Sequence, residues 1–237
     1  MASIDFTELF ATITTGTTGS WTSVDLTSIG VDNNAVVCVL IENKNTGAEA
    51  LCGVREVGSE LSRRHGLHEA EGDGSTSYVT HVQSDATASI EYYTDDGSTV
   101  FTLLGYYGAG ITYTEEVELH EPTVADWRVT AVGQTDTVFE FICRNSGGDG
   151  NTAVNVGVRK VGSTLARYYD IHEAEPSGIN CYTSYVQSDA SGNIQYHRED
   201  SYGQFQRLGY FSSNIQLVIG FLARTLDKSS ITTNLLP

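Results

Sequence analysis

Positive charge is scarce in this sequence. Of its 237 residues, 13 are Lys or Arg and 30 are Asp or Glu, which gives a formal net charge of −17. The only lysines are Lys44, Lys160 and Lys228. Nucleic acids and anionic membranes attract clustered Lys and Arg, so we expect neither as a partner.

The surplus of acidic residues has a second consequence. Self-repulsion destabilises a compact chain in dilute buffer, and proteins of halophiles use such an excess of charge. We interpret the acid-rich, lysine-poor composition as that of a protein from a halophilic environment. The alternative interpretation is an ordinary acidic surface.

Long apolar runs and catalytic motifs are lacking as well. No run approaches the roughly 20 apolar residues that span a membrane. The N-terminal segment MASIDFTELFATITTGTTGS has neither the basic start nor the apolar stretch of a secretory signal. The nucleophile elbow, the phosphate-binding loop, the dinucleotide fingerprint and the kinase signature do not occur. We therefore expect a protein that is not an enzyme and has no cofactor, with a polysaccharide hydrolase as the enzymatic alternative.

Cysteine is infrequent and follows no metal or disulfide pattern. The chain has four cysteines and no CxxC spacing, so we predict no disulfide framework and no metal site. Cys52 aligns with Val156 in the repeat described below, and Cys143 aligns with Ile41, so both are expected to be small core residues. A contact between Cys38 and Cys52 across a hairpin is an open alternative.

An internal duplication is the strongest feature that is present. Residues 53–107 align with 157–211 without a gap, and 26 of these 55 positions are identical. Upstream, Trp21 aligns with Trp127, and IDFTE at 4–8 aligns with ITYTE at 111–115. The sequence therefore predicts one repeat at 1–110 and a second at 111–214. Residues 215–237 would be a C-terminal strand or tail that contacts a neighbouring subunit, or the last strand of the second repeat.

Each repeat is expected to consist of strands. Proline is rare, with 3 residues, whereas glycine is frequent, with 24, and apolar residues alternate with polar ones around 37–41 and 50–54. Period-two alternation indicates strands with one face in a core. Further strands are expected at 78–84, 89–94 and 99–106 and at 182–188, 193–198 and 203–210. The predicted fold is all-β, with two tandem homologous β-sandwich domains that resemble jelly rolls.

Two details of the connections follow from the same pattern. The Asn- and Gly-rich loops at 42–50 and 144–153 are predicted to be hairpin loops between neighbouring strands. The segment 60–71 is predicted to hold one short helical turn.

A shared His-Glu-Ala-Glu motif is the first candidate site. Its carboxylates and imidazoles suit a cation, although the spacing is not that of a helical zinc site. The alternative is a loop whose side chains hold neighbouring strands together through hydrogen bonds. The candidate residues are His68, Glu69, Glu71, His172, Glu173 and Glu175.

Two arginines that recur in both repeats form the second candidate set. Guanidinium groups bind carboxylates in a forked geometry, so these side chains could hold a ligand or a partner subunit. The alternative, which the duplication favours, is an internal ion pair with Glu69 or Glu71. The residues are Arg55, Arg63, Arg159 and Arg167.

Three tyrosines recur at equivalent positions. Exposed aromatic rings stack on sugars or fill interfaces, but alternation within strands favours packing in the core. The residues are Tyr78, Tyr92 and Tyr106, with Tyr182, Tyr196 and Tyr210 in the second repeat.

The repeated pattern resembles domains in structural proteins of tailed viruses. The matching pieces are G-V-R-x-V-G-S with a following Arg, at 53–63 and 157–167, and L-G-Y-[YF], at 104–107 and 208–211. With the acidic composition, the resemblance implies a capsid turret, a decoration protein or a tail-associated protein of a haloarchaeal virus.

The expected function is therefore that of a non-enzymatic virion structural protein. Its expected partners are copies of itself in a homo-oligomer and other virion proteins such as the major capsid protein, and its location is the virion. The alternatives are a tail or baseplate component and an adhesin that binds host-surface glycan.

Overall fold

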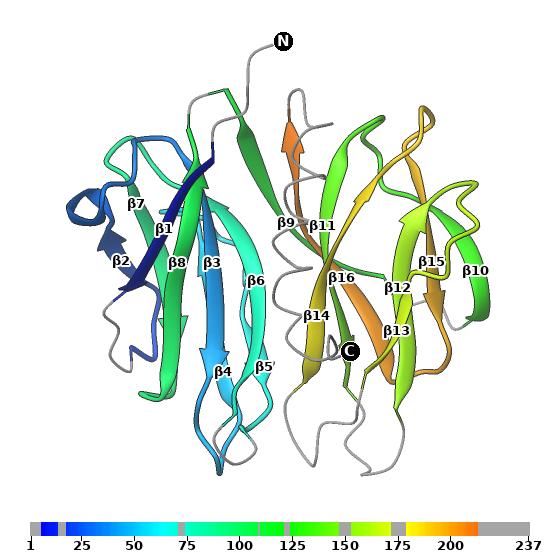
Figure 1. The fold of residues 1–237 in the computed structure, drawn as a ribbon, viewed down its shortest axis with the longest axis horizontal. Coiled ribbons are helices and arrows are strands. Elements are labelled where there is room, and N and C mark those ends of the chain that lie inside the picture. The colour runs from blue at the N-terminus through cyan, green and yellow to red at the C-terminus, as the bar shows by residue number, and fades with distance from the viewer. Residues whose placement is uncertain are drawn as a thin grey trace, which may run out of the picture.

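The computed structural model describes residues 6–13, 18–70, 74–108, 110–120, 124–146, 153–171 and 179–212. These residues form strands, together with one 3-10 turn at Thr27–Ile29. Figure 1 shows two packed groups of strands that follow each other along the chain.

The first domain contains two four-stranded antiparallel sheets. The first inner sheet has the order β1-β8-β3-β6, and the first outer sheet has the order β2-β7-β4-β5. The strands are β1 (Phe6–Ile13), β2 (Thr22–Asp25), β3 (Val36–Asn43), β4 (Ala50–Arg55), β5 (His65–Leu67), β6 (Thr76–Gln83), β7 (Ser89–Thr94) and β8 (Thr99–Tyr107).

The second domain repeats this arrangement. The second inner sheet has the order β14-β11-β16-β9, and the second outer sheet has the order β10-β15-β12-β13. The strands are β9 (Thr112–His120), β10 (Val124–Ala131), β11 (Val138–Asn145), β12 (Val154–Lys160), β13 (Tyr168–Ile171), β14 (Asn180–Gln187), β15 (Asn193–Arg198) and β16 (Gly203–Ser212).

The strand order confirms the predicted fold class. When β9 is placed on β1, every strand of the second domain has the same neighbours as its counterpart in the first. Each domain has eight strands in two sheets, and the chain changes sheet between successive strands except from β4 to β5 and from β12 to β13. This is the arrangement of a jelly roll. The chain is thus a tandem pair of homologous β-sandwiches.

The predicted hairpins at 42–50 and 144–153 are wrong. β3 pairs with β6 and β8, whereas β4 pairs with β5 and β7, so the chain crosses between sheets after Asn43. Both strands alternate in polarity whichever sheet they join, so the pattern does not distinguish a hairpin from a crossover. The helical turn predicted at 60–71 is also wrong, because this segment contains strand β5.

A buried asparagine donates hydrogen bonds to backbone carbonyls where the chain crosses from the inner to the outer sheet of each domain. The Nδ2 atom of Asn43 lies 3.0 Å from the carbonyl oxygen of Ala48, 3.1 Å from that of Leu67 and 2.9 Å from that of His68. Asn145 occupies the same position in the second domain, and its Nδ2 donates to the carbonyl of Ile171 at 3.0 Å. The amide thus satisfies loop carbonyls that would otherwise be buried without partners.

The central strands of the two inner sheets are buried on both faces. One face of each packs against its own outer sheet, as alternation predicted. The other faces meet across the domain boundary in a shared apolar cluster that is lined by Val36, Tyr107, Tyr113, Val138, Tyr185 and Phe211. Strand β6 lies against β14 and β9 of the second domain. The sheets therefore stack in four layers, in the order first outer, first inner, second inner and second outer sheet.

Candidate functional site

The first His-Glu-Ala-Glu loop contacts the second domain through its backbone. The backbone amide of His68 donates to the carbonyl of Ile179 at 3.2 Å, and the backbone amide of Ile179 donates to the carbonyl of Gly66 at 2.6 Å. The His68 side chain is buried, and its Nδ1 lies 2.9 Å from the carbonyl of Glu69. The described part of this loop thus joins two domains.

The rest of the motif is outside the described residues. This applies to Glu71, His172, Glu173 and Glu175, and also to the C-terminal segment 215–237. Within the described part of the chain, no group of three or more His, Cys, Asp or Glu side chains is placed to hold a metal ion. The described segments also contain no helix long and apolar enough to cross a membrane.

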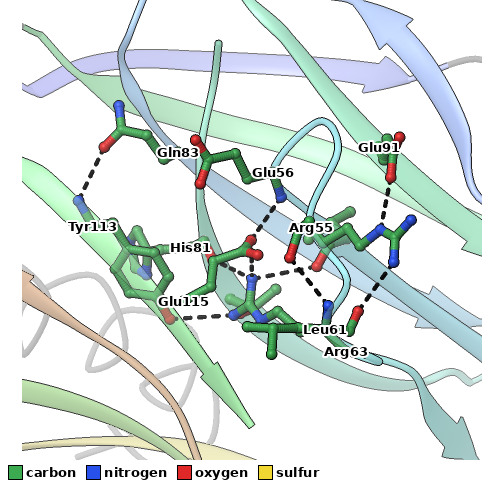
Figure 2. Close-up of polar contacts among 12 residues, drawn as sticks. Arg55, Glu56, Leu61, Arg63, His81, Gln83, Glu91, Tyr113 and Glu115 are labelled. Atoms are coloured by element: carbon green, nitrogen blue, oxygen red, sulfur yellow. Dashed lines mark hydrogen bonds and ion pairs between the residues drawn. The ribbon is translucent and has the colours of Figure 1, made fainter.

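Arg63 lies at the centre of the junction between the domains (Figure 2). Its Nη1 is 2.9 Å from Glu115 Oε1, and the two side chains are only 2% and 4% exposed. Nη2 donates to the hydroxyl of Tyr113 at 3.2 Å and to Thr80 at 3.1 Å, and Nη1 donates to the carbonyl of His81 at 3.0 Å. A buried ion pair of this kind needs further hydrogen bonds to offset its desolvation. The network supplies them for both terminal nitrogens of Arg63, whereas Arg63 Nε and Glu115 Oε2 are buried without a hydrogen-bond partner among the described residues.

The charge of Arg63 is secured by its surroundings. Burial opposes a charged guanidinium, but Tyr113 and Glu115 favour it more strongly, so the pKa of Arg63 is raised above its ordinary value. Glu115 also accepts a hydrogen bond from the backbone amide of Glu56 at 2.7 Å. The Glu115 carboxylate of the second domain therefore contacts two segments of the first domain, at Glu56 and at Arg63 (Figure 2).

A second buried polar group surrounds Glu140 on β11. Its Oε2 accepts from the hydroxyl of Tyr113 at 2.6 Å, and its Oε1 lies 3.4 Å from both His81 Nδ1 and the hydroxyl of Tyr185. Neither His81 nor Glu140 is exposed to solvent. The ring of Phe211 stands edge-on to the His81 imidazole at a centroid distance of 5.0 Å. Acidic, basic and phenolic groups thus meet in a site closed by aromatic rings.

The protonation of this group follows from burial and from the neighbouring charges. Burial works against the charged imidazole, but Cys38 and Glu140 favour it more, and the pKa of His81 rises to about 10. Burial, with Glu140 close by, raises the pKa of Tyr113 and Tyr185 above the ordinary value. Both hydroxyls therefore stay protonated and donate hydrogen bonds to Glu140.

Equivalent positions of the two repeats meet at this junction. His81 and Tyr185 differ by the repeat offset of 104, and so do Val79 and Thr183, whose hydroxyl donates to the Val79 carbonyl. The repeat alignment contained a signal for this site, because Glu140 stands in the otherwise apolar run VFEFIC. Sequence reasoning missed it, since a polar residue in an alternating strand normally faces water.

The four predicted arginines have different roles. Arg55 pairs with Glu91 of its own domain and Arg63 with Glu115 of the second domain. Neither is the predicted pair with Glu69, and Glu71 lies outside the described residues. Arg159 donates from Nε to Gln195 at 3.0 Å, and Arg167 donates from Nη2 to the carbonyl of Tyr185 at 3.2 Å. The Arg167 contact corresponds to the bond between Arg63 and the His81 carbonyl.

The six tyrosines pack into the cores, as alternation predicted. Tyr78, Tyr92, Tyr106 and Tyr196 are buried, and Tyr182 and Tyr210 pack partly buried against the second core. The cysteines are free thiols, and Cys52 and Cys143 are buried among apolar side chains as expected.

A different aromatic set lies on the outer sheets. In the first domain, Arg55 stacks over Trp21 at 4.2 Å, and Arg64 stacks over Tyr93 at 4.7 Å. Trp21 and Tyr93 are 5.8 Å apart between ring centroids. The sequence signal for this surface was the alignment of Trp21 with Trp127.

The second domain has an aromatic row at the equivalent place. Arg159 lies 3.9 Å above Trp127, and His197 follows at 5.5 Å from Trp127. Tyr168 stacks on His197 at 4.5 Å. The junction between the domains and the two outer sheets therefore both use equivalent positions of the two repeats, and some of these positions hold different residues in each repeat.

The chain matches no protein-family model and no curated protein. Among solved structures, it is similar to the N-terminal CBM22-1-CBM22-2 tandem domain of Paenibacillus barcinonensis Xyn10C, with 11% identity, 90% of this chain and 98% of that chain covered, and a TM-score of 0.23. A Paenibacillus xanthan lyase is 9% identical, with 87% of this chain and 25% of that chain covered and a TM-score of 0.23. Both likenesses are too weak to carry a functional conclusion.

Proposed function

We propose that the protein is a non-enzymatic structural protein of a virion surface, a capsid turret or decoration protein of a virus with a halophilic host. A tail or baseplate position is the alternative. The observation that carries the proposal is the junction between the two jelly rolls. A double domain that is held by buried ion pairs and aromatic rings acts as one stiff unit, which suits a projecting part of a particle.

The edge of the first inner sheet supports self-assembly. Phe10 lies in an irregular step of edge strand β1, between Glu8 and Ala11, and its side chain is 84% exposed. An edge strand offers unpaired backbone groups to another chain, and an exposed aromatic residue beside it adds apolar area to such a contact. The expected assembly is a closed cyclic homo-oligomer.

The test is light scattering on the purified full chain in molar KCl. We expect one discrete oligomer, and we expect Phe10→Ser to shift it to a monomer that keeps the wild-type far-UV circular dichroism spectrum. Val117→Ser is the matched control, because Val117 occupies the corresponding step of β9 and is less exposed, at 37%. A wild-type monomer at every protein and salt concentration would contradict the proposal.

A further inference from the structure

The second outer sheet carries a row of rings whose geometry depends on one glycine. Gly157 on β12 is paired with Tyr168 on β13 and with His197 on β15. Because Gly157 has no side chain, the two flanking rings meet above it and stack at 4.5 Å with an angle of 26° between their planes. Any Cβ atom at Gly157 would lie 2.0 Å from the carbonyl oxygen of Arg167. The local backbone therefore keeps this position free of a side chain.

Polar groups flank the aromatic row on both sides. Toward one side lie Arg159 and Gln195, which are register partners joined by a 3.0 Å hydrogen bond. Toward the other lie Asn155 and Glu199, joined by a bond of 2.7 Å from Nδ2 to Oε2. Burial lowers the pKa of His197, which leaves this imidazole neutral at pH 7. The surface thus combines ring faces with amide, guanidinium and carboxylate groups.

The first outer sheet has the same layout but is closed. Arg64 takes the place of Tyr168 and covers the ring of Tyr93, which is only 8% exposed. Arg55 is neutralised by Glu91 at 2.6 Å, where the second domain has the neutral Gln195 beside Arg159.

In the second domain, Tyr168 is 37% exposed, and Val129, beside Gln195 in the register, is 55% exposed. The second domain thus exposes an aromatic and an apolar side chain where the first exposes Arg64 and Ser23.

We propose that the aromatic row of Trp127, His197 and Tyr168 binds a neutral oligosaccharide. Aromatic rings bury the apolar faces of sugar rings, while amide, guanidinium and carboxylate groups exchange hydrogen bonds with hydroxyls. A neutral sugar fits the charge of the site better than an anionic one. Glu199 and Asp170 lie beside the row, and the whole chain carries a net charge of −17, which repels polyanions. This binding site goes beyond the proposed structural role.

The experiment uses the full chain in molar KCl and titrates it with cellohexaose, mannohexaose and chitohexaose, and with hexagalacturonate as the anionic probe. Binding is measured by calorimetry and by tryptophan fluorescence. We expect at least one neutral hexasaccharide to bind and hexagalacturonate not to bind. We expect Trp127→Ala and Tyr168→Arg to weaken binding at least tenfold.

Trp21→Ala is the matched control, since it removes the equivalent tryptophan of the closed surface and should leave the affinity unchanged. Far-UV circular dichroism and the unfolding midpoint verify that each variant is folded. No binding of any neutral hexasaccharide, an equal loss in both tryptophan variants, or preference for hexagalacturonate would each overturn the proposal. The oligomeric state is a separate readout, so failure of sugar binding is distinguishable from failure of the structural role.

Discussion

At the scale of single residues, the junction between the domains depends on charged side chains that are buried away from solvent. Arg63, Glu115, His81 and Glu140 are buried, and each has its partners on the opposite domain or on a neighbouring strand. Removing one member of a buried pair leaves the other charge uncompensated, which costs more than the pair itself contributes. These residues are therefore expected to be the most sensitive to substitution.

Arg63→Ala should lower the free energy of unfolding by about 3–5 kcal/mol, because it leaves Glu115 buried without its cation. Arg167→Ala is the matched control, since the equivalent guanidinium makes a hydrogen bond to the Tyr185 carbonyl and should cost about 1 kcal/mol. Urea unfolding of both variants measures the difference. Equal losses would show that the ion pair contributes nothing beyond a hydrogen bond.

The raised pKa of His81 predicts that the protein loses stability at alkaline pH. Its pKa is about 10 in the folded chain and 6.5 ordinarily, so the folded state binds the proton more tightly. The contribution is complete below pH 6.5 and is lost as the pH rises through 10. His81→Gln should therefore show a smaller drop in urea midpoint between pH 6.5 and pH 10 than the wild type.

His65→Gln is the control for this pH dependence. Burial, with Arg144 and Arg63 nearby, lowers the pKa of His65 to about 3, so this residue stays neutral throughout the interval. The His65 variant should keep the wild-type dependence on pH. If His81→Gln also keeps it, His81 is not the positively charged imidazolium in the folded protein.

At the scale of elements, period-two alternation located most strands but did not assign them to sheets. Val37, Val39 and Ile41 face the core of the first sandwich, as predicted. The next strand carries the same pattern, yet it belongs to the other sheet. Alternation reports only that one face of a strand is buried, so pairing partners depend on contacts distant in sequence.

The crossover between sheets should be sensitive to its asparagine. Asn43→Ala leaves the carbonyls of Ala48, Leu67 and His68 without their donor, and we expect it to lower the unfolding free energy by about 1–3 kcal/mol. Asn33→Ala, at an exposed position, should change it by less than about 0.5 kcal/mol. Thermal and urea unfolding measure both, and an unaffected Asn43 variant would refute this role.

At the scale of the whole molecule, the protein carries a large excess of negative charge. Its 30 Asp and Glu residues outnumber its 13 Lys and Arg residues, which gives the net charge of −17. Mutual repulsion of these carboxylates opposes compaction, and salt screens it.

The unfolding temperature should therefore rise steadily from dilute buffer to molar KCl. Replacing KCl with an equal osmolarity of sucrose separates charge screening from general exclusion effects, and sucrose should not reproduce the full increase. An unfolding temperature that is the same in dilute buffer and in molar KCl would remove the halophilic interpretation.

The sequence by itself determined the duplication, the all-β class and the core face of most strands. These features depend on the identity and spacing of residues along the chain, which the repeat offset and the alternation record directly. It also marked Trp21, Trp127 and the recurring arginines as positions that the two repeats share.

Only the tertiary structure decided that the second faces of the two inner sheets pack against each other. In an alternating strand, a polar residue such as His81 or Glu140 is normally expected to face water, and Arg63 is indistinguishable from a residue that pairs within its own loop. Docking the two inner sheets buried all three and gave each a partner far along the chain. The physical reason is that burial and charge pairing depend on which surfaces meet in space, which a pattern along one strand does not contain.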